Sequence, residues 1–132
     1  MNEEEMKERY MEYKQLDEQI KYVQKQVQMI ENQLEEFSNV IYNLDEFNAV
    51  KKETEILVPL SSGIFAKGKI QDTSEFLVNV GSNVIVQKDL QSTKKLIQTQ
   101  ISEMRNVQER MIAELQELVN RASKIEKELE NV

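Results

Sequence analysis

The residue types that most often carry out chemistry are scarce in this chain. Its 132 residues include no histidine and no cysteine, which removes the usual general base, the thiolate nucleophile and the commonest transition-metal ligands. Carboxylates are plentiful, as at Glu35-Glu36 and at Glu126, Glu128 and Glu130. A catalytic carboxylate pair needs a concave, partly dry site, so a solvated helix face is the simpler interpretation. We therefore predict no catalytic residue, no metal, no cofactor and no enzymatic activity.

A glycine- and lysine-bearing segment, GIFAKGK at residues 63–69, is the nearest approach to a phosphate-binding loop. Its spacing fits neither the P-loop nor the dinucleotide fingerprint, and no helical pattern follows it directly. Lys67 and Lys69 alternate with apolar neighbours. We interpret them as the solvent side of a strand edge that lysine keeps soluble.

The overall charge and hydropathy exclude two classes of partner. A net charge of −7 argues against non-specific binding to nucleic acid or anionic membranes. No apolar run approaches the ~20 residues of a membrane span, and the N-terminus is acidic, unlike a signal peptide. The lack of cysteine fits a reducing compartment. We expect a soluble, cytoplasmic protein with no nucleic-acid or membrane partner.

Residues 55–88 carry the strand periodicity of the sequence, together with all three glycines and the single proline. Apolar residues recur there with a period of two, which is typical of strands that bury one face. Connections at 61–63 and 81–83 predict two hairpins, joined by residues 71–74. Because two small hairpins are marginal alone in water, we expect them to pair with strands of other subunits. The expected assembly residues are Ile56, Val58, Leu60, Ile64, Ile70, Phe76, Val78, Val80, Val84 and Val86.

Heptad-patterned segments flank the strands on both sides. All ten a and d positions from Tyr13 to Leu44 are apolar, which predicts a coiled-coil helix. A second frame begins after Asp89, a candidate N-cap, and is interrupted by Lys94 and Gln108. We predict a single subunit over residues 1–132, with helices within 1–52 and 89–132 and the two hairpins within 53–88.

The two seams match if the helices pack antiparallel. Pairing Ile41 with Ile97 brings the chain termini together at the far end of arms roughly 60–70 Å long. In this register Gln108 faces Ile30. We hypothesise that this polar break fixes the register or loosens the coil locally.

At the free ends of these arms, two helices alone cannot bury every apolar side chain. Methionine and tyrosine are adaptable contact residues that suit surfaces accepting many partners. Ordinary seam residues at a frayed helix end are the alternative explanation. Taken as a group, the apolar residues at these ends predict a loose hydrophobic binding surface. Its expected members are Met6, Tyr10, Met11, Tyr13, Ile125, Leu129 and Val132.

Four short motifs lie between the helical segments: EILVPL at 55–60, SGI at 62–64, KGKI at 67–70 and VNVG at 78–81. With two hairpins between matched coiled-coil helices, they resemble the α-type subunit of archaeal prefoldin over essentially the whole chain. Gln87 stands where that family usually has an acidic residue, and Ser92-Thr93 where Glu-Ala is common.

The resemblance implies a hetero-hexamer of two α-type and four β-type subunits, with hairpins joined in a β-barrel platform. The implied fold class is mainly α with small β: an antiparallel two-helix coiled coil flanking two β-hairpins that form an oligomeric β-barrel. The implied function is that of an ATP-independent chaperone, or holdase. It would bind unfolded proteins at the tips of its arms and transfer them to a group II chaperonin. The alternative is a non-chaperone coiled-coil scaffold or spacer that docks through its strand head.

Overall fold

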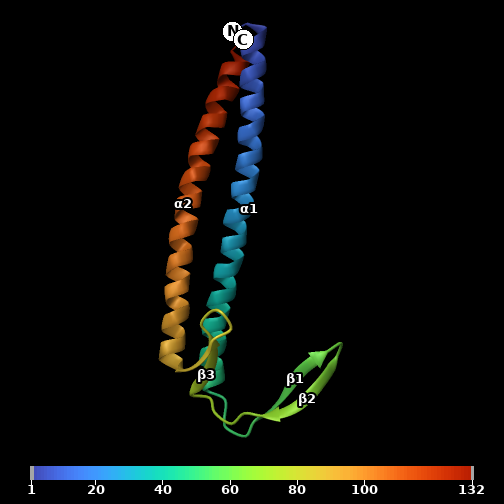
Figure 1. Cartoon of the computed structure of the whole chain (residues 1–132), viewed down its shortest axis with the longest axis vertical. Helices are drawn as coiled ribbons and strands as arrows, with labels where there is room; N and C mark the ends of the chain where they lie inside the picture. Colours follow the sequence, from blue (N-terminus) through green and yellow to red (C-terminus); the bar gives the residue numbers. More distant parts are fainter. Residues whose placement is uncertain (1, 132) are drawn as a thin grey trace. The chain divides into compact units, whose positions relative to one another are not determined.

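The computed structural model describes residues 2–131 and has the predicted fold class at the level of one chain (Figure 1). In the sequence, one long helix precedes and one follows two separate antiparallel hairpins. By contact, the chain divides into two compact units, which we name the coil unit (Met1–Glu35 with Ser102–Val132) and the head unit (Glu36–Ile101). The elements in chain order are α1 (Glu3–Asn48), β1 (Glu55–Ser61), β2 (Ile64–Lys69), β3 (Glu75–Asn79), β4 (Ile85–Asp89) and α2 (Leu90–Glu130).

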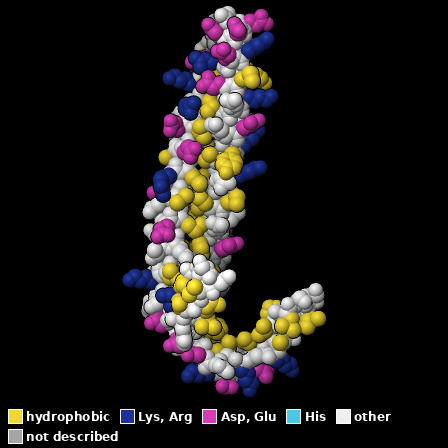
Figure 2. Space-filling model, viewed as in Figure 1, with side chains coloured by type: hydrophobic (Ala, Val, Ile, Leu, Met, Phe, Trp, Pro, Cys, Tyr) yellow, Lys and Arg dark blue, Asp and Glu magenta, His cyan; other side chains and the backbone are white. Residues whose placement is uncertain are grey.

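In the coil unit, α1 and α2 pack antiparallel along the predicted seam. Arg9 near the start of α1 forms an ion pair with Glu128 near the end of α2, with Nε and Oε2 3.3 Å apart. Figure 2 shows apolar side chains along the line between the helices and charged side chains outside it. This distribution is typical of a coiled coil, in which each helix covers the apolar stripe of the other. The buried core consists of Leu16, Val23, Leu118, Ala122 and Ile125.

Gln108 lies close to the position that the predicted register gives it. Its Nε2 donates a hydrogen bond to Glu31 Oε2 at 2.7 Å and a longer one to the carbonyl oxygen of Val27 at 3.5 Å. The predicted register places Gln108 opposite Ile30, and its contacts with Val27 and Glu31 lie within one helical turn of that residue. Hydrogen bonding satisfies the polar side chain at the seam.

In the head unit, the two hairpins turn where the sequence predicts. Ser62 and Gly63 connect β1 to β2 with φ values of 47° and 81°, the left-handed conformation that suits two-residue hairpin turns. The register changes between Pro59 and Ser61, so Leu60 is the extra residue of a β-bulge. In the second hairpin Val78 pairs with Val86.

Helix α2 begins with the predicted cap. The backbone N–H of Ser92 donates to Asp89 Oδ1 at 2.7 Å, and the hydroxyl of the buried Thr93 donates to the Asp89 carbonyl oxygen at 2.7 Å. The first bond satisfies an N–H group that a helix N-terminus otherwise leaves unpaired, and the second gives the buried Thr93 hydroxyl an acceptor. On the neighbouring strands, the Gln87 amide donates to the Glu75 carboxylate. An acidic residue at position 87 would place two like charges together here.

Candidate binding surfaces

The predicted tip residues differ in exposure. Tyr10 and Met11 are 58% and 63% exposed, while Met6 is half-buried. Ile125 is buried in the core of the coil unit, and Tyr13 and Leu129 pack against that core. Val132 lies outside the described residues. Among the described residues at this end of the coil unit, Tyr10 and Met11 therefore offer the most exposed apolar surface to a ligand.

Acidic side chains surround this end of the coil unit. A shallow recess is lined by Glu5, Glu8, Arg9, Glu12 and Glu128, and Arg9 contacts the carboxylates of Glu12 at 3.1 Å and Glu128 at 3.3 Å. Over the described residues, no group of three or more acidic side chains is arranged to hold a metal ion. The guanidinium instead links the two helices by ion pairing.

The predicted assembly residues fall into two groups in the head unit. Ile70 is buried within its own chain, at 7% exposure. Phe76, Val78 and Val86 are half-buried, and the Phe76 ring centroid lies 5.8 Å from that of Phe47 on α1. These four residues already contact their own chain in part. The exposed members of the predicted set are Ile56, Val58, Leu60, Ile64, Val80 and Val84.

Sequence reasoning missed a second apolar face on the hairpins; Figure 2 shows apolar side chains exposed on β1 and β2. Pro59 pairs with Phe65, whereas the predicted face contains the Val58 and Ala66 pair. Adjacent strand residues point to opposite faces, so the two pairs lie on opposite sides. The signal was present in the runs ILVPL at 56–60 and FLV at 76–78, since continuous apolar runs indicate burial on both faces. The exposed residues that were missed are Leu57, Phe65, Leu77 and Ile85.

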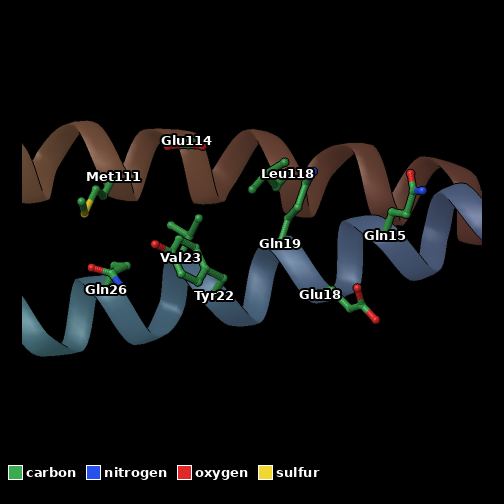
Figure 3. Close-up of a pocket in the computed structure, with 9 residues that line it drawn as sticks. All are labelled: Gln15, Glu18, Gln19, Tyr22, Val23, Gln26, Met111, Glu114 and Leu118. Atoms are coloured by element: carbon green, nitrogen blue, oxygen red, sulfur yellow. The ribbon is translucent and has the colours of Figure 1, made fainter.

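Sequence reasoning also missed a groove along the coil unit, with a volume of about 730 Å³ (Figure 3). Tyr22, which is 64% exposed, falls outside the heptad frame and is the most prominent apolar group there. Because it precedes the buried Val23 by one residue, it points about 100° away from that side chain, and most of its surface stays in solvent. The lining residues are Gln15, Glu18, Gln19, Tyr22, Val23, Gln26, Met111, Glu114 and Leu118.

Two aspartates of the head unit have pKa values held below the ordinary range by hydrogen bonds. At Asp72 the hydroxyl and the backbone N–H of Ser74 donate to Oδ1 and lower the pKa. At Asp89 the backbone N–H of Ser92 is the main cause of the lowered pKa. All three hydrogen bonds favour the charged form of the carboxyl that accepts them. Each closes a local turn or cap, so we assign both carboxylates structural roles.

Two coiled-coil helices with two β-hairpins between them define a class of coiled-coil subunit with a strand-rich head. The chain belongs to the prefoldin family, since the family model described as prefoldin subunit matches residues 16–132. Among the described residues, no helix combines the length and apolar character needed to span a bilayer.

Individual relatives agree with this assignment. The chain is similar to prefoldin subunit alpha of Archaeoglobus fulgidus, with 25% identity over 128 residues, which cover 97% of this chain and 93% of the relative. Prefoldin subunit alpha of Thermofilum pendens is 28% identical over 115 residues, covering 87% and 89% of the two chains. A cryo-EM structure of filamentous prefoldin from Methanocaldococcus jannaschii has the same fold. It superposes with a TM-score of 0.76 at 16% identity, over 87% of this chain and 95% of that one. The chain is therefore a chaperone subunit, and the spacer alternative is not favoured.

Proposed function

We propose that this chain is the α-type subunit of a prefoldin complex and holds unfolded proteins at the free ends of its coiled coil. The observation that carries the proposal is the exposure of Tyr10 and Met11 at the helix end where the ion pair of Arg9 and Glu128 joins the two helices. Adaptable apolar groups in solvent suit a surface that accepts many sequences. Holding by such contacts needs no nucleotide and no chemical step.

The hairpins support the assembly part of the proposal. Their apolar residues stay exposed on both faces in the single chain, and exposed patches of this kind mark protein interfaces. We infer that they join a second α-type and four β-type subunits in a β-barrel platform. Several weakly binding arms would then act together, because each bound arm raises the effective concentration of the next. Weak single contacts also allow the client to pass to a group II chaperonin in the cytoplasm.

The test is suppression of client aggregation by the assembled complex. Removal of about the first and last dozen residues of this chain should preserve assembly and abolish suppression, because the exposed tip groups are lost. The double variant Tyr10→Ser with Met11→Ser should weaken suppression roughly threefold, since only this subunit type is altered. Its matched control is Tyr42→Ser with Val119→Ser, two exposed positions elsewhere on the helices. Full suppression by the truncated complex would refute the tip assignment.

A further inference from the structure

We propose that the groove of the coil unit (Figure 3) is a second client site, which takes an extended polypeptide segment carrying lysine or arginine beside apolar residues. The proposal rests on the holding function proposed above. It adds a site away from the helix ends, with a sequence preference set by its own lining residues. Three kinds of lining side chain carry it: apolar, acidic and amide.

The floor of the groove is apolar and already partly desolvated. Val23 and Leu118 come from facing helices and are buried to 8% and 7% exposure, and Met111 beside them is half-buried. Tyr22 forms an exposed wall on α1 (Figure 3). An apolar side chain entering between Tyr22 and Met111 would cover surface that the helices leave open. Burying that surface favours binding, and the tyrosine keeps its hydroxyl in water.

The charge of the groove has one sign. Its lining contains two carboxylates, Glu18 on α1 and Glu114 on α2, and no lysine or arginine. Neither carboxylate is in an ion pair within the part of the chain that the structure describes. Cationic side chains bound along the groove would therefore be attracted by these carboxylates, and an acidic segment would be repelled. The sign also disfavours nucleic acid and anionic lipid as occupants.

The remaining lining groups suit a polypeptide backbone. Gln15, Gln19 and Gln26 lie along one wall, and each amide offers both donors and an acceptor. An extended peptide presents N–H and C=O groups at regular intervals whatever its sequence. Amides can pair with these groups without selecting a particular residue. The groove thus combines tolerance for the backbone with a preference for basic and apolar side chains.

The size of the groove fits a short segment of a client. A volume of about 730 Å³ accommodates a few side chains, and the groove is open to solvent along the coil. Binding there alone would be weak. Combined with tip contacts on the same client, it would add to the affinity by raising the effective concentration at each site.

The test uses two fluorescein-labelled peptides that have the same apolar residues and differ only in arginine or aspartate at the charged positions. Each is titrated against the assembled complex, with binding read by fluorescence anisotropy. The arginine peptide should bind about tenfold more tightly, because two exposed pairs each contribute a small factor. The preference should shrink as salt is raised. Glu18→Gln combined with Glu114→Gln should abolish it, and Tyr22→Ser should weaken binding of the arginine peptide about threefold.

Matched controls separate the groove from general surface charge. Glu35→Gln with Glu103→Gln removes two exposed carboxylates outside the groove lining and should preserve the preference. Tyr42→Ser should not weaken the arginine peptide. Equal binding of both peptides by the unaltered complex, or a preference that survives neutralisation of Glu18 and Glu114, would overturn the proposal. Suppression of aggregation is measured on the same preparations. Normal suppression without a peptide preference would refute the groove alone, whereas absent suppression would refute the holding function.

Discussion

The coil unit and the hairpins use the same apolar residue types with opposite results. In the coil unit Leu16 and Ile125 are 3% and 5% exposed, whereas Leu57 and Leu77 on the hairpins are 64% and 77% exposed. The seam of one helix is covered by the other helix of the same chain. Each hairpin has only two strands, and no strand of one hairpin pairs with a strand of the other. The core of the coil is therefore covered within one chain, whereas the hairpin faces are not.

This difference separates what one subunit can stabilise alone from what it needs partners to stabilise. Burial of an apolar side chain favours folding only when a surface is available to cover it. Two-stranded hairpins offer little such surface and are marginal in water. We therefore expect mutations in the coil to act on the folding of the chain and mutations in the hairpins to act on assembly.

The largest effect should come from a charge placed on the hairpins. Val84→Asp replaces an exposed residue in the second turn, just before β4, so the single chain should fold normally. On assembly it would bury an unpaired carboxylate against partner strands, at a cost of several kcal/mol. We expect the hexamer to disappear from native mass spectra after co-expression with a β-type partner.

The matched control for this charge is Val119→Asp. Val119 is similarly exposed, at 40% against 53% for Val84, but lies on α2 within the coil unit. The control should assemble normally, and helix content by circular dichroism should be unchanged in both variants. Recovery of a normal hexamer with Val84→Asp would show that Val84, which closes the turn before β4, is not part of the assembly surface.

A moderate effect should separate the two regions directly. Leu16→Ala creates a cavity in the coil core and should lower the free energy of unfolding of the purified chain by about 2–4 kcal/mol. Leu57→Ala should change the same quantity by less than about 0.5 kcal/mol, because the side chain is exposed. Urea unfolding followed by circular dichroism measures both.

In assembly the order should reverse: Leu57→Ala should impair formation of the complex more than Leu16→Ala does. Truncation of Leu57 should raise the concentration needed to form the complex with a β-type partner. The reason is that the second apolar face of the hairpins would lose contact area with the partner strands. Equal assembly by Leu57→Ala and the unaltered chain would mean that this face stays in solvent.

The coil could be predicted closely because one repeat specifies it. Ten apolar a and d positions fix which stripe is buried, and matching two such stripes fixes the register to within a turn, as the Gln108 contact with Glu31 confirms. The hairpin turns were predictable for a similar reason. Positive φ is confined to a few residue types, and Ser62, Gly63, Ser82 and Asn83 adopt it.

The binding surfaces were harder to predict, because periodicity identifies a stripe but not what covers it. Ile125 was assigned to an exposed tip although it occupies a seam position, and the facing helix buries it. Tyr22 has no heptad role, so nothing in the pattern distinguishes it from a solvated side chain. The second face at Leu57 and Phe65 was missed because a period-two pattern was fitted to runs that are apolar throughout.

The smallest predicted effect concerns Asp89, which joins the two regions in sequence by ending β4 and capping α2. The Ser92 N–H lowers the pKa of this carboxyl in the folded chain, so the unfolded chain binds the proton more readily. The stabilisation is therefore present above the ordinary pKa and is lost as pH falls through the lowered folded-state pKa.

Asparagine caps a helix about as well but does not titrate there. Between about pH 5 and pH 3, the melting temperature of Asp89→Asn should fall less than that of the unaltered chain. Asp89→Ser, also a good cap, should behave likewise, while Asp89→Ala should melt a few degrees lower at neutral pH. If Asp89→Asn kept the full acid dependence, the hydrogen bond to Ser92 would not be coupled to folding.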